Sequence, residues 1–320
     1  MLLLQKKRQR KNKDCLMKTP RWFLKKNLFA FLLWPFSLIY FLIGRIVGFV
    51  RSKNVYKSRR PIICVGNIFA GGVGKTPIVR KIAEFFDAPI VMRGYKKDKS
   101  NSGIGDEAQM LSNAGLTVHV GDRKSNLVLL NKQKLESGPV VMDDGLQNPS
   151  IKKDISIVVF DDGLGYGNGF MLPAGPLRVP KKYAKNADAI IVIKSKNPRK
   201  NFELPDEIPV FYAENKTLSP YDGGEKLFAF AGIGYPDKFF AALDRVVDKK
   251  RFPDHYQYSD EDIENLIKAA KKKKAKLVTT EKDWVRLSEK YQKKIKYASL
   301  ETVIEDAFFV WVKEKLKCQQ

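Results

Sequence analysis

Short apolar runs follow one another along most of the chain after residue 60, separated by glycine-containing turns or by segments with helical spacing. The runs cover 61–67, 88–95, 116–121, 139–144, 155–161 and 189–194. They do not alternate with polar residues, which is typical of strands buried on both faces. Residues 77–86 repeat their apolar positions at helical spacing instead. Strands alternating with helices predict an α/β fold, with a mostly parallel sheet and helices on both of its faces.

A second block of elements begins near residue 216. Residues 227–234 and 275–283 have the pattern of strands, and residues 260–274 that of a helix with an acidic first turn and a basic last turn, which suits the helix dipole. Prolines and paired glycines cluster around the start of this block, as they do in linkers. We therefore expect a core domain over 61–215 and a smaller C-terminal α/β domain over 216–320.

The first 60 residues have a different pattern, in which an apolar segment is flanked by lysines and arginines. The segment Leu28–Ile43 contains sixteen residues, which as a helix extend roughly 24 Å, less than the ~30 Å hydrocarbon core of a bilayer. Pro35 lies in its middle and is expected to kink the helix. These features predict a membrane-associated helix that lies in the interface or re-enters it, within a basic N-terminal region over 1–60. A signal peptide, a single membrane span and a buried core helix remain as alternatives.

The charge of the chain points to an anionic partner. The net charge is +24, and residues 1–60 carry 16 Lys and Arg against one acidic residue, Asp14. A membrane surface, an acidic lipid or a nucleic acid fits such a charge, but no interleaving of aromatic and basic residues favours nucleic acid. Three cysteines and two histidines are too few for a disulfide framework or a histidine-based zinc site, so we expect a reducing, cytosolic environment.

A glycine-rich loop follows the first of the apolar runs and precedes a helix. It contains three glycines, a lysine and a threonine: Gly71, Gly72, Gly74, Lys75 and Thr76. Glycines let the backbone N–H groups approach a phosphate at the helix N-terminus, the lysine reaches the β- and γ-phosphates, and the hydroxyl binds Mg²⁺. Phe69 stands where the commonest pattern has its first glycine, so the loop resembles the G-G-x-G-K-T variant. The loop predicts a P-loop NTPase-like fold that binds ATP; a glycine turn with a chance lysine is the alternative.

Two acidic pairs follow predicted elements of the sheet. Asp143 and Asp144 end the run 139–144, where a carboxylate beside the glycine loop can hold Mg²⁺ directly or through water. The alternative for this pair is a simple Asp-Gly turn. Asp106 and Glu107 begin a helical segment, so Asp106 is either a helix N-cap or a carboxylate that activates a hydroxyl or helps to bind metal.

Two further segments are candidates for the same site. His255 lies in a Pro-Asp loop rather than on an apolar face, and a histidine paired with a distant carboxylate can form a general-base dyad. His119 lies in an apolar strand and is expected to be structural. The proline- and glycine-rich segment Leu172–Arg178 ends in an arginine that suits a phosphate or substrate, although a rigid turn explains the segment equally well.

Taken together, the motifs resemble one family. Their order is FLLWPFSLIY, VGNIFAGGVGKTP, RGY, GDEA, VGDR, DDGLQ, GNGFMLPAGPLR, FPDHY and TTEKD. This series is similar to that of the tetraacyldisaccharide 4′-kinases, the lipid A 4′-kinases of Gram-negative bacteria, from about residue 20 to residue 290. The resemblance implies transfer of the γ-phosphate of ATP, with Mg²⁺, to the 4′-hydroxyl of a tetraacyldisaccharide 1-phosphate, which gives lipid IVA. It also implies a monotopic or peripheral enzyme on the cytoplasmic face of the bacterial inner membrane.

The resemblance also implies roles for individual residues. Lys75 and Thr76 serve the phosphates and Mg²⁺, while Asp143 and Asp144 serve the metal and the charge network of the site. Asp106 paired with His255 is the implied base, and Glu107 is placed beside it to assist Mg²⁺. Contacts to substrate are expected from three residues: Arg178, Gln147 and Asn67.

Two departures from the family pattern stand out. Val179 follows Arg178, where the family usually has a glutamate, and the basic run Gln5–Lys13 is not part of the pattern. The main alternative function is a membrane-associated regulatory ATPase with the same type of loop. Such proteins usually carry a lysine just before the glycines, where this chain has Ala70, and they do not need an Asp106–His255 pair.

Overall fold

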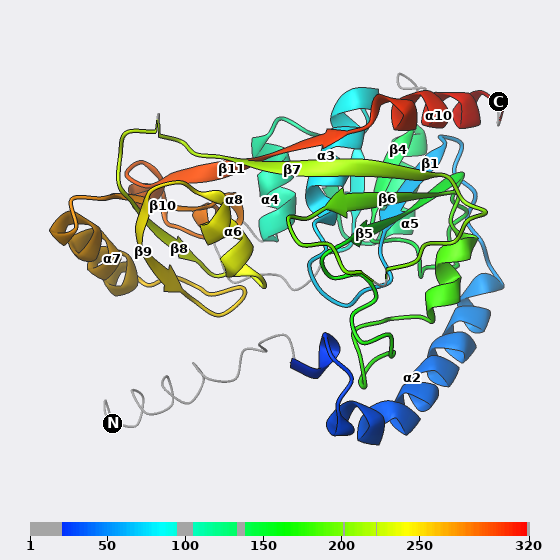
Figure 1. Ribbon diagram of the computed structural model, residues 1–320. Coiled ribbons are helices and arrows are strands. Elements are labelled where there is room, and N and C mark those ends of the chain that lie inside the picture. Colours follow the sequence, from blue (N-terminus) through cyan, green and yellow to red (C-terminus); the bar gives the residue numbers. More distant parts are fainter. Residues whose placement is uncertain (1–20, 95–104, 133–137, 201, 222, 319–320) are drawn as a thin grey trace, which may run out of the picture. The chain divides into compact units, whose positions relative to one another are not determined.

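The computed structural model describes residues 21–94, 105–132, 138–200, 202–221 and 223–318 (Figure 1). The chain divides into a larger unit, Arg21–Lys216 with Glu301–Gln320, and a smaller unit that includes Thr217–Leu300. The C-terminal residues from 301 onward thus group with the larger unit, whereas the sequence pattern places them in the C-terminal domain. The basic run Gln5–Lys13 lies outside the described residues.

The larger unit is built on a parallel sheet whose strand order is β3-β2-β4-β1-β5-β6-β7. Its strands are β1 (Ile62–Gly66), β2 (Ile90–Met92), β3 (Val118–Val120), β4 (Val140–Asp143), β5 (Ile155–Asp161), β6 (Ala189–Lys194) and β7 (Val210–Leu218). In register, Cys64 of β1 lies opposite Met142 of β4 on one side and Ser156 of β5 on the other. The first six strands confirm the runs expected from the sequence, whereas β7 falls where a linker was predicted.

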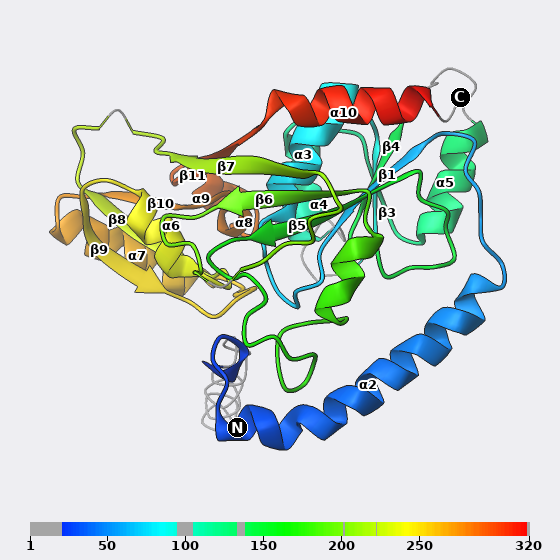
Figure 2. The same ribbon diagram turned by 45° about the vertical axis from the view of Figure 1, so that its right-hand side comes forward.

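Helices cover both faces of this sheet. They are α3 (Lys75–Phe86), α4 (Asp106–Asn113), α5 (Arg123–Lys132) and α10 (Asp306–Lys317), with the 3-10 helix η2 (Lys181–Asn186) beyond β5. Ile62 and Cys64 pack with Leu127 of α5. The intervening residues of β1 point to the opposite face, where α3 contacts the strand, and they are equally buried. Phe85 of α3 stacks on Phe309 of α10 with ring centroids 4.1 Å apart, and Figure 2 shows these two helices side by side.

The smaller unit repeats the same architecture on a smaller scale, with parallel strands in the order β11-β10-β8-β9. Its elements are β8 (Leu227–Ala231), α6 (Pro236–Ala242), β9 (Val246–Arg251), α7 (Asp260–Lys272), β10 (Lys276–Thr280), α8 (Glu281–Trp284), α9 (Glu289–Gln292) and β11 (Lys296–Ile304), the last of which ends in the larger unit. Phe228 and Phe230 of β8 pack with α7, and Leu227 and Ala229, on the other face, pack with α6. Strand alternation therefore places one helix on each face.

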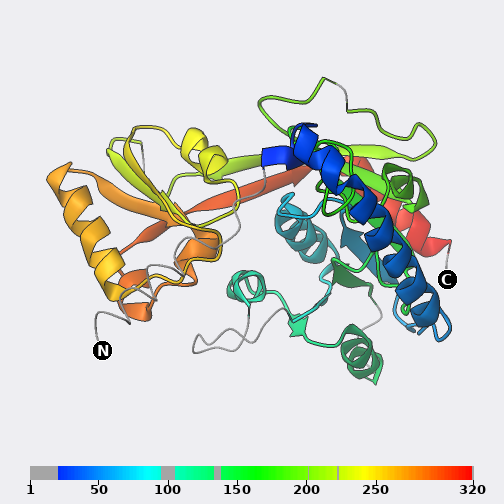
Figure 3. The same cartoon turned by 90° about the horizontal axis from the view of Figure 1, so that it is seen from below.

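The N-terminal helix α2 (Leu28–Ser52) follows the short η1 (Arg21–Phe23) and lies along the outside of the larger unit (Figure 3). Its 25 residues extend about 37 Å, so the estimate of a segment too short to cross a bilayer was wrong. The helix is long and apolar enough to span a membrane, and only 11% of its most apolar window is buried. A buried core helix is thereby disfavoured. The sequence estimate stopped at Ile43 because Gly44 and Arg45 interrupt the apolar run, yet the backbone continues as a helix through both.

A narrow stripe of α2 fastens it to the larger unit. Asn27 caps the helix by accepting a hydrogen bond from the backbone N–H of Ala30 at 2.9 Å. Ala30 and Ser37 are buried, seven residues apart on one face, and the Ser37 hydroxyl donates to the Met171 carbonyl at 2.9 Å. The large apolar side chains on the remaining surface are exposed, from Leu28 at 87% to Tyr40 at 40%. Exposed apolar surfaces of this extent occur where a protein meets a membrane or another protein.

Candidate functional site

The glycine-rich loop links the carboxyl end of β1 to the first turn of α3. Gly71 and Gly74 adopt φ values of 134° and 82°, which a residue with a β-carbon reaches only with strain. Gly74 is the N-cap of α3, and Lys75 is the first residue of the helix. Thr76 follows in the same turn. The unpaired N–H groups and the positive end of the helix dipole therefore meet at this loop, as an anion-binding site requires.

The ammonium group of Lys75 is held at the mouth of the loop by two oxygen atoms. Its Nζ donates to Asn67 Oδ1 at 3.0 Å and lies 3.2 Å from Asp144 Oδ1. Asn67 is fully buried; its Nδ2 donates to the Phe69 carbonyl, and its own carbonyl accepts from Gln147 Nε2, both at 2.7 Å. Asn67 and Gln147, which we expected to contact substrate, are thus engaged in organising the loop.

Asp144 stands between two cations. Its carboxylate lies near Lys75 and accepts hydrogen bonds from Arg178 Nη1 at 3.0 and 2.9 Å. Burial alone would raise the pKa of Asp144, but the charges of Lys75 and Arg178 outweigh it and hold the pKa below its ordinary value. Asp144 also adopts a φ of 51°, a left-handed conformation that aspartate tolerates at turns. This backbone turn aims its carboxylate at the loop.

Asp143 is buried beside the same cluster without a hydrogen-bond partner for Oδ1 among the described residues. Burial raises the pKa of this carboxyl to about 7; the negative charges of Glu107 and Asp144 act in the same direction, whereas Lys75 and Arg123 oppose them. An unpaired buried carboxylate with an acidic neighbour suits a bound cation. Within the described ranges no three or more His, Cys, Asp or Glu residues are placed so that they could together hold a metal ion, so a metal here would need other ligands as well.

Arg123 supports the backbone of this acidic pair, a role that the sequence analysis missed. It is the first residue of α5 and is buried. Its Nη2 donates to the carbonyls of Asp143 at 2.7 Å and Asp144 at 3.0 Å. The arginine stands in the VGDR motif, which is the one signal in the sequence that could have identified it.

The segment Leu172–Arg178 is bound to the glycine-rich loop by backbone hydrogen bonds. The N–H of Ala70 donates to the Pro176 carbonyl at 2.6 Å, and the N–H of Arg178 donates to the Ile68 carbonyl at 2.8 Å. A β-carbon at Gly175 would lie 2.1 Å from the side-chain oxygen of Asn168, so this position has no room for a side chain. The segment is a rigid turn, and it also places Arg178 at Asp144. A rigid turn and an arginine positioned for a ligand are therefore compatible interpretations of this segment.

Asp106 and Glu107 open helix α4, as the sequence predicts. The N-cap of this helix is Gly105, and Asp106 is its first helical residue. The alternative in which Asp106 serves as the N-cap is therefore wrong. Glu107 is close enough to Asp143 to influence its pKa, which brings it to the acidic cluster.

The two histidines lie in different places. His119 is in β3, as expected for a residue of an apolar strand. His255 belongs to the smaller unit and Asp106 to the larger one, so the pairing of these two side chains stays a prediction. The smaller unit holds His255 in a left-handed backbone conformation with a φ of 57°.

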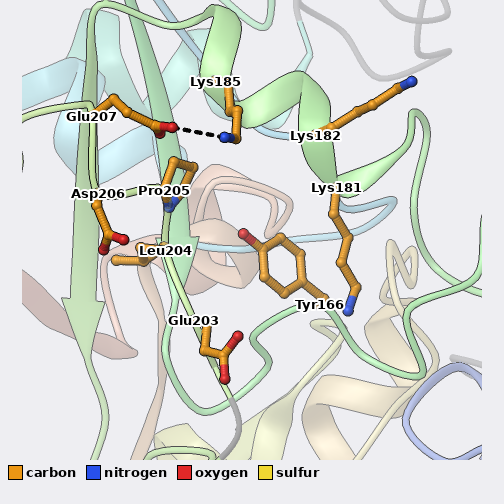
Figure 4. A pocket seen from close by; sticks show the side chains of 9 residues that line it. All are labelled: Tyr166, Lys181, Lys182, Lys185, Glu203, Leu204, Pro205, Asp206 and Glu207. Atoms are coloured by element: carbon orange, nitrogen blue, oxygen red, sulfur yellow. Dashed lines mark hydrogen bonds and ion pairs between the residues drawn. The ribbon is translucent and has the colours of Figure 1, made fainter.

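A hollow lined by three lysines of η2 lies on the larger unit (Figure 4). Lys181 lies beside Tyr166, Lys182 points away from the segment 203–207, and Lys185 Nζ lies 2.9 Å from Glu207 Oε1. None of the predicted site residues lines this hollow.

Known proteins resemble this chain over most of its length. Residues 29–317 match the family described as tetraacyldisaccharide-1-P 4′-kinase. The tetraacyldisaccharide 4′-kinase of Rickettsia canadensis (strain McKiel) is 37% identical over 291 residues, covering 83% of this chain and 87% of that relative. The enzyme of the same name from Rickettsia felis is 35% identical over 293 residues, covering 84% and 88%.

A solved structure shares the fold. The crystal structure of LpxK from Aquifex aeolicus, described as in complex with ATP, aligns with a TM-score of 0.70. The alignment covers 91% of this chain and 99% of that one at 23% identity. The α/β fold with a mostly parallel sheet, expected from the sequence, is thereby confirmed.

Proposed function

Because the chain belongs to the tetraacyldisaccharide-1-P 4′-kinase family, we propose that it transfers the γ-phosphate of ATP to the 4′-hydroxyl of a tetraacyldisaccharide 1-phosphate. In this reaction the 4′-oxygen forms a bond to the γ-phosphorus, and the bond from that phosphorus to the β–γ bridging oxygen breaks. The proton of the hydroxyl passes to a base. The products are ADP and the 1,4′-bisphosphorylated lipid, lipid IVA.

One observation carries the proposal: Lys75 and Arg178 converge on the single carboxylate of Asp144 beside the glycine-rich loop. The triphosphate brings more negative charge to this place than one carboxylate can, so both cations are positioned to contact phosphate oxygens when ATP binds. Phosphoryl transfer depends mainly on such positioning and charge neutralisation. The backbone N–H groups of Gly71, Gly72 and Gly74 complete the phosphate contacts.

The acidic cluster fits a magnesium ion bound together with ATP. The buried, unpaired Oδ1 of Asp143 and the hydroxyl of Thr76 are oxygen ligands of the kind Mg²⁺ prefers, and Glu107 lies close enough to assist. Bound there, the ion would neutralise charge on the β- and γ-phosphates. Its positive charge would also keep Asp143 ionised in spite of burial.

We assign the acceptor side of the site to Asp106, paired with His255. Asp106 opens α4 immediately before Glu107, so it stands next to the residue that approaches the acidic cluster. A carboxylate there can accept the proton of the 4′-hydroxyl as the new bond forms. Gln147 and Arg178 border the same edge of the sheet and remain candidates for contact with the disaccharide.

The acylated acceptor requires a site at a membrane. The exposed apolar surface of α2 and the basic residues of the N-terminal region suit an enzyme bound to the cytoplasmic face of the bacterial inner membrane. In this arrangement the acyl chains of the substrate stay in the bilayer while its headgroup reaches the loops of the larger unit.

The test is transfer of ³²P from [γ-³²P]ATP to the tetraacyldisaccharide 1-phosphate by purified protein in detergent with Mg²⁺. We expect a labelled lipid product that depends on the acceptor. Hydrolysis of ATP without labelled lipid, in the presence of good acceptor, would instead support the regulatory ATPase. Family membership disfavours that alternative.

A further inference from the structure

The short 3-10 helix η2 carries three exposed lysines that the proposed reaction does not use. They are Lys181, Lys182 and Lys185. Lys185 is paired with Glu207, whereas no ion pair holds Lys181 or Lys182 within the part of the chain that the structure describes. Two neighbouring ammonium groups without a carboxylate repel each other and favour an anionic partner.

The same short helix packs against the C-terminal half of α2, as Figure 1 shows for the green helix that follows β5. Tyr183 makes the contact. Its hydroxyl accepts a hydrogen bond from Arg45 Nη1 at 3.1 Å, and its ring lies edge-on to Phe41 with the centroids 6.4 Å apart. Phe41 follows the buried Ser37 by one helical turn, so η2 extends the stripe on which α2 is fastened to the larger unit.

This packing fixes the depth of η2 once α2 lies in a membrane interface. An interfacial helix lies at the boundary between the headgroups and the acyl chains. An element packed on its protein-facing side has its axis about 8–10 Å further out. The headgroup layer on each side of a bilayer is roughly 5–8 Å thick, and a lysine side chain carries its ammonium group well beyond its backbone. The lysines of η2 are thus within reach of lipid phosphates.

Both lysines keep their charge available for an anion. Lys181 Nζ lies 4.9 Å from the centroid of the Tyr166 ring, a contact that orients the ammonium group without neutralising it. Lys182 points away from the acidic segment 203–207 (Figure 4). The exposed guanidinium group of Arg45 adds a third cation on the adjoining turn of α2.

We propose that η2 is a second membrane contact of this protein, at which Lys181 and Lys182 bind the headgroups of anionic phospholipids beside α2. This inference rests on the proposed function for the position of α2 in the membrane interface. A single interfacial helix leaves the rest of the protein free to tilt about the helix axis. A second contact away from that axis fixes the tilt, so that the larger unit keeps one orientation toward its lipid acceptor.

The charge of η2 can be tested with the full-length variant Lys181→Gln/Lys182→Gln. We expect it to bind vesicles of phosphatidylcholine with phosphatidylglycerol about 30-fold more weakly than the wild type at low salt, and to bind pure phosphatidylcholine vesicles as the wild type does. Lys315→Gln/Lys317→Gln is the matched control, because it removes the same charge from exposed positions of α10. Lys315 also lies over an aromatic ring, that of Trp311. Equal losses in the two variants would overturn the inference.

The depth of η2 can be measured directly with a fluorophore on a single cysteine. The described part of the chain contains two free cysteines, the buried Cys64 and the exposed Cys318. Asn186→Cys in a Cys15→Ser/Cys318→Ser chain places the label at the end of η2 and leaves its lysines intact. The Cys15→Ser chain, labelled at Cys318, is the control, because α10 lies across the sheet from α2 (Figures 1 and 2).

Nitroxide groups on the lipid headgroups report which label lies at the membrane. On phosphatidylglycerol vesicles we expect strong quenching of the label on η2 and little quenching of the label at Cys318. Equal quenching of the two labels, or none on η2, would overturn the second contact.

Neither vesicle measurement depends on catalysis. If the proposed function is wrong, the wild type will not phosphorylate the acceptor in detergent, although both vesicle measurements keep their expected results. If the wild type is an active kinase and the lysine variant of η2 binds anionic vesicles as tightly as the wild type, the proposed function stands and the contact at η2 is overturned.

Discussion

At the scale of single residues, a substitution of Lys75 tests the proposed phosphate-binding role of the glycine-rich loop. Its ammonium group lies between Asn67 and Asp144, where it can stabilise the charge on the transferring phosphate. We expect Lys75→Met to lower kinase turnover by about 100-fold or more. Lys81→Met, an equivalent change in the same helix away from the loop, is the control and should stay close to wild type. Retained activity in Lys75→Met would remove the central claim about the loop.

A substitution of Asp106 tests the proposed proton transfer from the 4′-hydroxyl of the acceptor. Because the proposed role of its carboxylate is to take the proton from the 4′-hydroxyl, Asp106→Asn should lower kcat by about 100-fold or more while the Kd for ATP changes little. The measurement is turnover with the lipid acceptor, together with equilibrium binding of ATP. Turnover near that of the wild type would exclude Asp106 as the base. A matching loss of ATP affinity would instead place this carboxylate with the nucleotide.

Sequence and structure agree best at residues whose function follows from local pattern. The glycine loop and the acidic pair Asp143-Asp144 lie where the sequence predicts them, before α3 and at the end of β4. Each is formed by consecutive residues, so its position can be predicted from the local pattern alone. Arg123 stands in the VGDR motif, but its contacts do not follow from the motif, because the carbonyls at the end of β4 lie beside α5 only once the sheet has formed.

At the scale of elements, the start of α5 has two roles: Asp122 caps the helix, and Arg123 supports the acidic pair of the candidate site. The Asp122 carboxylate accepts from the N–H and the hydroxyl of Ser125, both at 2.8 Å, and the next residue, Arg123, holds the carbonyls of the acidic pair. Asp122→Ala should therefore destabilise the protein by about 1 kcal/mol at neutral pH. Chemical denaturation of both proteins gives the difference.

The pH dependence of this difference follows from the pKa of Asp122. The hydrogen bonds from Ser125 hold the pKa of the carboxyl below its ordinary value of 3.8. A depressed folded-state pKa stabilises the protein above the unfolded pKa, and this contribution is lost as the pH falls through the folded value. The destabilisation by Asp122→Ala should thus be constant from neutral pH down to about pH 5 and shrink on further acidification. A difference that grows in acid would contradict this role.

Ser37 tests the seating of α2. This buried residue donates to Met171 and accepts from the N–H of Ala174 at 3.3 Å, within the segment that leads to Arg178. Ser37→Leu should destabilise the protein by about 1–3 kcal/mol through overpacking and lower kinase activity, while vesicle binding stays intact. Ile39→Leu, on the exposed side of the same helix, is the control. Wild-type activity in Ser37→Leu would show that the seating of α2 does not affect the site.

The sequence predicts strands that are buried on both faces, but it does not predict strands that leave one side exposed to solvent. The strands β7, β9 and β11 were not predicted, because each leaves part of its residues exposed and carries Lys or Glu along its length. In β7 the burial alternates along the strand, which fits a strand with one solvent-facing side. Such strands lack an unbroken apolar run, so the prolines and paired glycines on either side of β7 predict a linker there instead.

At the scale of the whole molecule, two forces should act together in membrane binding. The net charge of +24 attracts anionic lipid through an interaction that salt screens within about 10 Å at 0.1 M, whereas the exposed apolar surface of α2 binds by burial, which salt does not screen. We expect the protein to sediment with vesicles containing phosphatidylglycerol. Raising NaCl from about 0.05 M to about 0.5 M should reduce the bound fraction without abolishing it.

We expect the vesicle binding that remains at high salt to come from the apolar surface of α2, and a variant of this surface tests it. Replacing Phe31, Leu32, Ile39 and Ile43, all more than half exposed, with serine removes on the order of 1.5–3 kcal/mol of transfer free energy for each side chain that the bilayer would bury. This variant should bind anionic vesicles at low salt, leave them at high salt, and fail to bind neutral phosphatidylcholine vesicles. If it stayed bound at high salt, the apolar anchor would lie elsewhere in the chain. If the wild type were released completely by salt, α2 would not be inserted, and charge alone would hold the protein at the membrane.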